Sequence, residues 1–190
     1  IMVKVDMDKA YEMMEWSFVI RVMRRMGFSD WVCDLFFRCY ASPWLSVSFS
    51  GWVFGFFKEV RGLRQGDPLS PNIFVLAQEA LSRSFNRRVE DPIIAPFRAK
   101  PRSPMMSHLM FVDDYLFFMN GSLRSLSIFN KVLEVYGRWS GKRVNKEKSS
   151  VFLPKQCSRR RRGQIRVRLG MPEKELPLVY LGVPLSDGKV

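Results

Sequence analysis

The central feature of this sequence is the stretch His108-Leu109-Met110-Phe111-Val112-Asp113-Asp114-Tyr115-Leu116-Phe117-Phe118-Met119. Two short apolar runs stand on either side of a pair of acidic residues. This pattern predicts two antiparallel strands joined by a tight turn, with Asp113 and Asp114 at its tip. Ile1 to Asp6 predicts a further strand, which is mostly apolar and ends at the carboxylate of Asp6.

A sheet can hold carboxylates rigidly at the ends of its strands, so Asp6, Asp113 and Asp114 are candidates for one site. Phosphoryl transfer uses this arrangement, because two divalent cations about 3.5–4 Å apart clamp the attacking and leaving oxygens. Such a site suits Mg²⁺, which keeps several waters and takes its other ligands from carboxylates and phosphates. The alternative is that Asp113-Asp114 is only a polar hairpin turn, since aspartate is a favoured turn residue.

The rest of the chain shows a mixture of helical and strand patterns. Helices are expected at Trp16–Met26, at Trp31–Tyr40, after an N-cap at Ser70, at Leu123–Trp139 and at Gln156–Leu169. Strands are expected at Leu45–Ser50, near Phe54–Val60 and at Leu178–Val183. Asp91–Ser107 holds four prolines and is expected to be a long loop. The mixed order indicates an α+β fold rather than a regular array of β-α-β units.

Length and charge narrow the class of protein. The chain has 190 residues, enough for one domain with a core, and 47% of them are hydrophobic. Lys and Arg number 31 against 18 Asp and Glu, which gives a formal net charge of +13. This excess makes a polyanion such as nucleic acid the leading partner class, and a basic surface without a ligand is the alternative.

The cysteines and the histidine argue against a structural zinc site. Cys33, Cys39 and Cys157 have no CxxC spacing and His108 is the only histidine, whereas such a site needs about four N or S ligands. Reduced cysteines fit a nuclear or cytoplasmic setting. No apolar run approaches the roughly 20 residues of a membrane span, and the first residues are unlike a signal peptide. We therefore expect neither a membrane span nor secretion.

A second candidate binding segment is the loop Arg61-Gly62-Leu63-Arg64-Gln65-Gly66-Asp67-Pro68-Leu69-Ser70-Pro71, which could contact phosphate or a nucleotide. Gly62 and Gly66 permit a positive φ or the close approach of another backbone. Arg61 and Arg64 are candidates to meet phosphate, and the free N–H groups of the helix that follows suit a phosphate or a nucleotide edge. An ordinary capped loop is the alternative.

Five segments together resemble the motifs of reverse transcriptases from non-LTR (LINE-type) retrotransposons, particularly those abundant in plants. They are Lys4–Glu12, Arg61–Pro71, His108–Asp114, Ser140–Ser149 and Tyr180–Leu185, in the family's order. The resemblance implies that residues 1–190 are part of a reverse transcriptase domain. The implied fold is a polymerase palm, an antiparallel sheet backed by helices, with an inserted hairpin and with the fingers and thumb largely absent.

The implied activity is that of an RNA-directed DNA polymerase, which adds deoxynucleotides to a primer 3′-hydroxyl on an RNA template. By position in the motifs, Asp6 and Asp113 would be the main ligands of two Mg²⁺ ions, with Asp114 close by. Tyr11 would lie beneath the incoming sugar and exclude a 2′-hydroxyl. These roles follow from the resemblance and not from the spacing of the residues.

Further roles carry over for the nucleotide and the primer. Gln65 and Gly66 would lie near the incoming nucleotide and the template, and Gly182 would let a strand pass close to the primer backbone. Lys146 or Lys148 would approach the triphosphate, and the motif does not choose between them. For either lysine, simple exposure to solvent is the alternative.

Two positions depart from the family pattern: Glu12 stands where Asp is usual, and Val112 where Ala is more frequent. Neither is an expected ligand. A catalytically inactive remnant that only binds nucleic acid is the main alternative function, and an intron-encoded or viral RNA-copying polymerase is another. The basic run Ser158–Arg162 with Arg166 and Arg168 predicts either contact with duplex phosphates or a solvated basic face.

Overall fold

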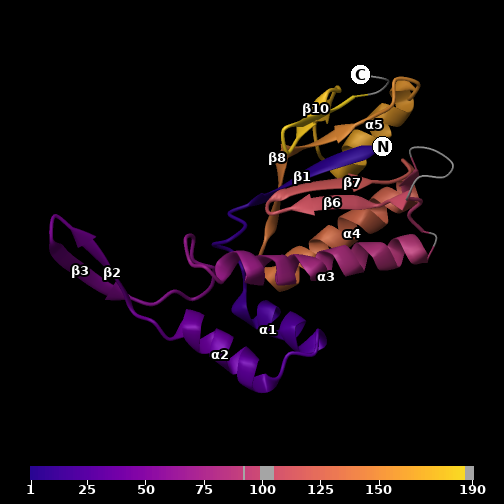
Figure 1. Ribbon diagram of the computed structural model, residues 1–190. Helices are drawn as coiled ribbons and strands as arrows, with labels where there is room; N and C mark the ends of the chain where they lie inside the picture. The colour runs from indigo at the N-terminus through magenta and orange to yellow at the C-terminus, as the bar shows by residue number, and fades with distance from the viewer. Residues whose placement is uncertain (92, 99–104, 187–190) are drawn as a thin grey trace.

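A five-stranded sheet forms the centre of the computed structural model, which describes residues 1–91, 93–98 and 105–186. Its strands are β1 (Met2–Asp8), β6 (His108–Phe111), β7 (Asp114–Phe118), β8 (Arg143–Phe152) and β9 (Glu173–Lys174). Their order is β6–β7–β1–β8–β9 (Figure 1). All neighbours pair antiparallel except β8 and β9, which are parallel.

Strand β1 lies between β7 and β8, and its side chains alternate between two faces of the sheet. Val3, Val5 and Met7 are buried in the main core. Lys4 and Asp6, which point to the opposite face, are only half-buried. One short strand therefore supplies both a hydrophobic surface and a row of charged groups.

Helices lie on the side of the sheet to which Val3 and Val5 point, and the second of them in chain order packs on the first rather than on the sheet. They are α1 (Trp16–Arg25), α2 (Asp30–Ala41), α3 (Ser70–Glu90), α4 (Leu123–Ser140) and α5 (Arg159–Leu169). Helices α3 and α4 lie directly beneath the sheet, and α1 packs against both of them from the outside (Figure 1). No helix in the described part of the chain is long and apolar enough to cross a membrane.

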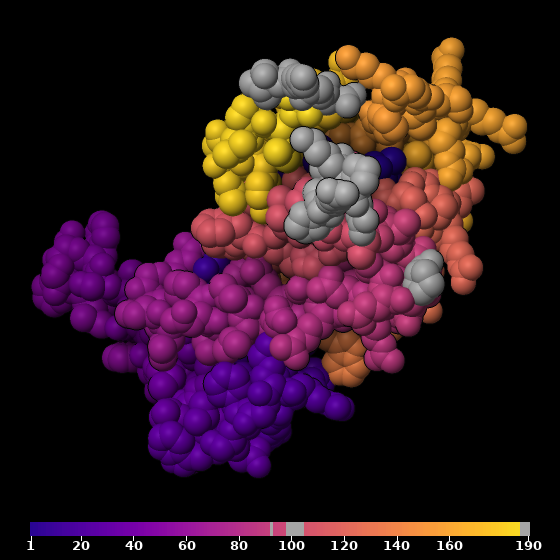
Figure 2. Space-filling view, turned by 45° about the vertical axis from the view of Figure 1, so that its right-hand side comes forward, coloured from indigo at the N-terminus to yellow at the C-terminus, as the bar shows by residue number. Residues whose placement is uncertain are grey.

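Three two-stranded hairpins complete the fold. They are β2 (Leu45–Phe49) with β3 (Trp52–Phe57), β4 (Phe97–Arg98) with β5 (Met105–Met106), and β10 (Leu178–Tyr180) with β11 (Val183–Leu185). The β2–β3 hairpin projects away from the body of the molecule (Figures 1 and 2). The β10–β11 hairpin covers the other face of the sheet, where Tyr180 packs with Leu116 and Phe118.

The structure confirms the predicted palm, an antiparallel-rich sheet backed by helices with an inserted hairpin. The acidic hairpin forms as β6 and β7, although Asp114 is already the first residue of β7. Helix α4 ends where expected, because Gly141 adopts the left-handed conformation with φ of +79°. The predicted loop Asp91–Ser107 contains strands β4 and β5, and its residues 92 and 99–104 lie outside the described part.

Three expectations about local structure were wrong. Ser70 is not an N-cap: Leu69 takes that place, and the buried Ser70 hydroxyl instead hydrogen bonds with the Tyr40 hydroxyl at 3.1 Å. Leu178–Val183 is not one strand, because Leu181 and Gly182 have positive φ and turn the chain into a hairpin. The basic helix begins at Arg159, after an N-cap at Ser158, rather than at Gln156. In addition, the longest strand, β8, had no counterpart among the predicted elements.

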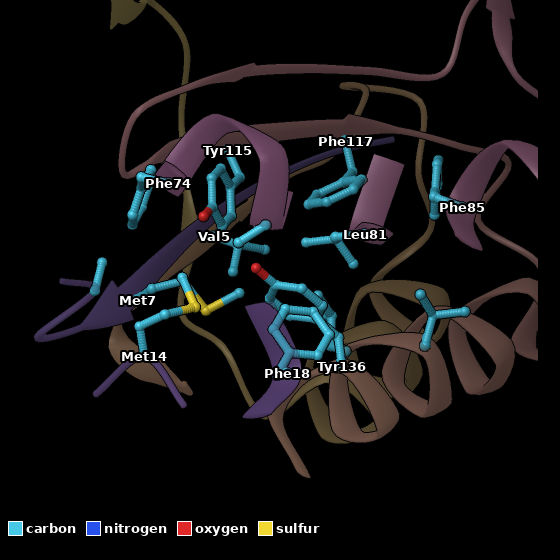
Figure 3. Packing of buried hydrophobic residues seen from close by; sticks show 14 of the residues in the cluster. Val5, Met7, Met14, Phe18, Phe74, Leu81, Phe85, Tyr115, Phe117 and Tyr136 are labelled. Atoms are coloured by element: carbon cyan, nitrogen blue, oxygen red, sulfur yellow. The ribbon is translucent and has the colours of Figure 1, made fainter. Parts of the chain in front are cut away.

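An aromatic cluster joins the sheet to the helices. Phe117 of β7 is fully buried and contacts Phe85 of α3 (ring centroids 4.9 Å apart) and Phe129 of α4 (5.0 Å). Figure 3 shows Phe117 and Phe85 among the other packed side chains. Asp113 immediately precedes strand β7, so this packing anchors the strand next to the candidate site.

Truncation of Phe117 should therefore be costly for stability. We expect Phe117→Ala to lower the free energy of unfolding by about 3–5 kcal/mol, because it removes a large buried side chain and leaves a cavity. Urea unfolding followed by circular dichroism measures this change. Phe111→Ala is the matched control, since Phe111 lies on the neighbouring strand but is 58% exposed. We expect the control to shift the value by less than about 0.5 kcal/mol, and equal losses for the two variants would contradict the assigned core.

Candidate active site

Two carboxylates meet at the end of the central strand. Val5 of β1 pairs with Tyr115 of β7, so the next residue, Asp6, lies beside the start of β7 and the turn before it. Asp113 occupies that turn, between β6 and β7. The negative charge of Asp113 also contributes to the raised pKa of Asp6. The sheet thus brings together two side chains that are more than a hundred residues apart in sequence.

The groups around Asp6 shift the pKa of its carboxyl in both directions. Burial is the largest cause that raises the pKa of the Asp6 carboxyl, and Asp113 and Asp8 raise it further. The ammonium of Lys148 is the strongest influence in the opposite direction, followed by that of Lys4. The pKa of Asp6 therefore reflects burial and two neighbouring carboxylates on one side and two lysine ammonium groups on the other.

The turn that contains Asp113 is held by hydrogen bonds from helix α3. Val112 has a φ of +50°, which is uncommon for a β-branched residue. The buried Gln78 of α3 donates hydrogen bonds to the Val112 carbonyl and to the Tyr115 hydroxyl, the latter at 2.8 Å. These contacts tie the strained turn to the helix layer and so restrict the position of Asp113.

Asp114 is engaged differently from the other two carboxylates. Lys4 lies beside it on β1, and the Lys4 ammonium is 2.7 Å from the Asp114 carboxylate. The hydroxyl of Tyr180 also donates to the Asp114 carbonyl at 3.4 Å. Within residues 1–91, 93–98 and 105–186, no group of three or more His, Cys, Asp or Glu is arranged to hold a metal ion.

A bulge in strand β8 brings lysine to Asp6. Lys4 pairs with Ser150 and Asp6 with Asn145, so residues 146–149 of β8 stand opposite a single residue of β1. The Ser149 hydroxyl accepts from the Asp6 backbone N–H (3.0 Å) and donates to the Asn145 carbonyl (2.6 Å), which holds the bulge in place.

Lys146 and Lys148, between which the sequence motif did not choose, have different surroundings in the bulge. Lys148 is the cation with the largest effect on Asp6. Lys146 lies against the C-terminus of α5, where a Cβ added to Gly170 would be 3.3 Å from the Lys146 Nζ. The geometry therefore favours Lys148 over Lys146 as the lysine nearer the carboxylates.

The loop Arg61–Pro71 docks on the segment that follows β1. The Gly62 N–H donates to the Met14 carbonyl (2.8 Å) and the Leu63 N–H to the Tyr11 carbonyl (2.9 Å). A Cβ at Gly62 would lie 2.8 Å from the Glu12 carbonyl oxygen, and its φ is +98°. Only glycine fits there, because both the backbone conformation and the close approach exclude a side chain.

This docking positions several of the predicted site residues around Tyr11. The Tyr11 ring stacks on Phe74 with centroids 4.4 Å apart and an interplanar angle of 5°. Burial raises the pKa of the Tyr11 hydroxyl, and the charge of Asp113 raises it further. Gln65 donates to the Glu12 carboxylate at 2.8 Å, and Gly66 has a φ of +88° with open space around it.

The residues predicted to contact nucleic acid differ in how far their side chains already bond to other groups of the protein. Arg64 is engaged by the protein, since its guanidinium donates to Glu59 (3.0 Å) and to the Tyr40 carbonyl (3.2 Å). Arg61 is 3.6 Å from Glu15 and remains 42% exposed. Gly182 lies in the turn of the β10–β11 hairpin with a φ of +80°, so that turn requires a flexible residue whether or not a primer passes nearby.

The basic helix α5 uses some of its arginines for folding. Arg162 donates to the Cys157 and Pro154 carbonyls, each at 3.0 Å, and pairs with Glu173. Arg161 donates to the Gly121 carbonyl. The remaining arginines, such as Arg159 and Arg160, are exposed. The run is thus partly structural, which neither of the two sequence interpretations anticipated.

Lys142 is a feature that the sequence did not single out. Its side chain is 1% exposed, and its Nζ lies 3.7 Å from the centroid of Phe74 and 3.4 Å from the Tyr115 hydroxyl. Tyr11 and Phe74 are too close for a nitrogen between them, so Lys142 and Tyr11 occupy opposite faces of Phe74. Burial lowers the pKa of Lys142 to about 7, while Asp113 raises it. A lysine in a polar segment after a helix gives no sequence signal for burial.

Comparison with known families gives one match over nearly the whole chain. Residues 1–185 match the family model described as reverse transcriptase (RNA-dependent DNA polymerase).

Three curated relatives are similar over parts of their length. The Retrovirus-related Pol polyprotein from type-2 retrotransposable element R2DM of Drosophila melanogaster is 25% identical over 130 residues, 68% of this chain and 12% of that protein. Its counterpart from type-1 retrotransposable element R2 of Popillia japonica is 24% identical over 148 residues, 77% of this chain and 23% of that protein. An uncharacterized mitochondrial protein of Arabidopsis thaliana is 48% identical over 54 residues, 28% of this chain and 44% of that protein. This chain thus spans less than half the length of each.

Two solved structures share the fold. A telomerase from Candida tropicalis in complex with a fragment of telomeric RNA superposes with a TM-score of 0.59 at 15% identity, over 78% of this chain and 25% of that one. Apo telomerase from the same organism, truncated from its C-terminal domain, gives a TM-score of 0.57 at 18% identity, over 78% of this chain and 29% of that one. Identities this low show a common architecture and nothing finer.

Burial of Lys142 should make stability depend on pH. Its folded pKa of about 7 lies below the ordinary value of 10.5. Between these values the unfolded chain binds a proton that the folded chain does not, so stability rises with pH. Lys142→Met removes the group that titrates, so the variant should be more stable than the parent at pH 6. We expect that advantage to shrink by about 2–3 kcal/mol between pH 6 and pH 9.

Urea unfolding of the two proteins at both pH values measures this effect. Lys155→Met is the control, since Lys155 is exposed and its substitution should give the same difference at each pH. A Lys142→Met advantage that stays constant with pH would show that the lysine is not buried as a titrating group.

Proposed function

This chain belongs to the reverse transcriptase (RNA-dependent DNA polymerase) family, and we propose that it forms the catalytic palm of a non-LTR retrotransposon polymerase. The observation that carries the proposal is the meeting of Asp6 and Asp113 at the end of the central strand, on the face opposite the helices. The similarity to Pol polyproteins of R2 elements supports the non-LTR class.

The proposed reaction extends a DNA primer on an RNA template. The primer 3′-hydroxyl loses its proton to solvent and its oxygen attacks the α-phosphorus of a deoxynucleoside triphosphate in line. A new P–O bond forms as the bond between the α-phosphorus and the oxygen bridging to the β-phosphorus breaks, and pyrophosphate leaves. Asp6 and Asp113 would hold two Mg²⁺ ions, which lower the pKa of the primer hydroxyl and neutralise developing charge. Lys148 is the residue that we assign to the triphosphate, in preference to Lys146.

The described residues fit such ions through two carboxylates rather than three. Mg²⁺ needs only one or two protein carboxylates when substrate phosphates and waters complete its six ligands. Asp6 and Asp113 satisfy this requirement, and their mutual repulsion is a physical reason for a cation between them. Asp114 has Lys4 as its partner, so we assign it a supporting role in which it fixes the start of β7.

The nucleotide would lie over Tyr11 in this proposal. Stacking on Phe74 fixes the Tyr11 ring, and a fixed aromatic ring can exclude the one extra oxygen of a ribonucleotide. Gln65, held by Glu12, and Gly66 stand on the docked loop next to this position. Arg61 is the more accessible of the two arginines assigned to phosphate, because the Arg64 guanidinium is already satisfied by the protein.

A remnant that only binds nucleic acid is the second candidate function. The pairing of Asp114 with Lys4 favours it, because this pair removes one of three carboxylates from the site. The burial of Lys142 beneath the site also favours it, since a desolvated lysine weakens the fold. The two candidates differ in whether primer extension occurs.

Removal of one carboxylate tests the catalytic assignment. In the full reading frame that contains this chain, Asp113→Ala should lower the rate of primer extension by at least about a thousandfold, because the metal site loses a ligand. Binding of an RNA–DNA duplex should stay within about threefold, since the charge on duplex-facing groups is otherwise unchanged. Gel-based extension and filter binding measure the two quantities.

Asp34→Asn is the matched control, because Asp34 is an exposed carboxylate on α2 paired with Arg38. It should extend primers at the parental rate. Extension that survives Asp113→Ala would overturn the catalytic assignment, whereas a parent that never extends a primer would favour the remnant.

Replacement of Tyr11 tests the position of the sugar. Tyr11→Ala opens space beneath the incoming nucleotide, so the preference for deoxyribonucleotides over ribonucleotides should fall by roughly tenfold to a hundredfold. Single-nucleotide incorporation with matched dNTP and rNTP gives the ratio. Tyr11→Phe keeps the ring on Phe74 and should keep the preference. An unchanged ratio for Tyr11→Ala would place the sugar elsewhere.

A further inference from the structure

A groove lies on the outer side of the helix layer, away from the carboxylates. It consists of two adjoining hollows of about 420 Å³ and about 310 Å³, which share Phe18, Ala80 and Trp139 in their walls. The walls come from α1, α3 and α4. In Figure 1 these helices lie on the opposite side of the sheet from the β10–β11 hairpin, so the groove is separate from the site of Asp6.

The charge of this groove has one sign. Six exposed cations stand along the two hollows: Arg21, Arg25, Arg83, Arg87, Arg88 and Lys131. Neither hollow has a carboxylate among its described lining residues. By contrast, the basic hollow beside Arg138 and Arg143 contains Glu134, and the one beside Arg162 contains Glu173 and Glu175.

Most of these cations have no acidic partner in the part of the chain that the structure describes. Arg83 pairs with Glu79 at 2.8 Å, and Arg88 is 3.8 Å from Asp91. Within the described residues, the other four make no ion pair. Four uncompensated charges around a concave surface attract a polyanion more strongly than the same charges would if they were scattered.

Aromatic rings form part of the groove wall. The rings of Phe18 and Tyr136 meet edge to face with centroids 5.7 Å apart, as their neighbouring positions in Figure 3 illustrate. Trp139 is 50% exposed, and the Arg21 guanidinium lies 4.4 Å from its centroid. An exposed ring flanked by cations is the combination that binds single-stranded nucleic acids, through base stacking and phosphate contacts.

We propose that this groove between α1, α3 and α4 is a second binding site, which takes a segment of single-stranded RNA. A strand fits the observations better than other polyanions do. A bilayer is flat and would meet the rims but not the hollows, and a duplex offers no free bases to an exposed Trp139. Because the groove lies on the far side of the sheet, the RNA held there is not the part being copied.

Charge neutralisation within the groove is the first test. The probe is a fluorescently labelled 12-nucleotide oligo(U), and the measurement is its anisotropy with the 190-residue chain over a range of salt concentrations. Arg87→Gln with Lys131→Gln removes two unpaired cations. We expect about tenfold weaker binding at low salt, and a fall of about 1.4 in the slope of log K against log salt, which corresponds to two lost phosphate contacts.

Arg159→Gln with Arg160→Gln is the matched control, because both arginines are exposed on α5 and the change in net charge is identical. This control should keep the parental slope. Equal losses for the two double variants would overturn the proposal, since they would mean that RNA is attracted by net charge alone.

An uncharged substitution separates stacking from charge. Trp139→Ala leaves the net charge unchanged and should weaken oligo(U) binding by about fivefold or more. Thermal melting checks that each variant is folded. Parental affinity for Trp139→Ala would refute a nucleic-acid groove, as would displacement of oligo(U) by poly-glutamate of equal charge at equal concentration, which would point to an acidic protein partner. Asp113→Ala should bind oligo(U) like the parent, so this test can fail or succeed independently of the polymerase assignment.

Discussion

Strand β1 is hydrogen-bonded on both edges, to β7 and to β8, and this pairing positions both the core and the candidate site. A strand paired on both edges cannot rotate or slip, because a shift of one residue would exchange its buried and exposed side chains. Val3 and Val5 fix the register by packing against the helix layer. The same register then places Lys4 and Asp6 on the opposite face, next to the start of β7. The packing that fixes the core therefore also fixes the position of the Asp6 carboxylate.

Several local devices keep the end of β1 rigid. The bulge in β8 is closed by Ser149, the acidic turn is held by Gln78, and the loop at Gly62 docks through backbone hydrogen bonds to the residues after β1. The first two contacts tie an irregular segment to a regular element, and the third joins two loops to each other. Such rigidity suits a site in which metal ions and substrate, rather than moving side chains, would supply the chemistry.

Some basic side chains of this protein bond to groups within the fold, and others face the solvent. Arg162 and Arg64 bond to carbonyl groups and carboxylates within the chain, whereas Arg87 and Lys131 face the solvent along a hollow with no acidic residue in its described lining. The basic run that is most conspicuous in the sequence is thus partly structural. The surface that we propose for RNA is assembled from cations scattered over three helices, and their sequence spacing does not reveal it.

Features with local patterns could be predicted from the amino-acid sequence: the acidic hairpin, the end of α4 at Gly141 and the family that the motifs resemble. These follow from apolar alternation, turn residues and contiguous motif strings, all of which can be read over a few neighbouring residues. Strand β8 escaped prediction because its polar side chains form a strand only beside β1, and Leu178–Val183 was misjudged because Leu181 turns the chain. Three features became visible only in the folded chain: Lys148 rather than Lys146 acts on Asp6, Lys142 is buried against Phe74, and six cations line one groove. Those facts depend on contacts between distant segments, and the free energy of such contacts is set by packing and desolvation rather than by the residues alone.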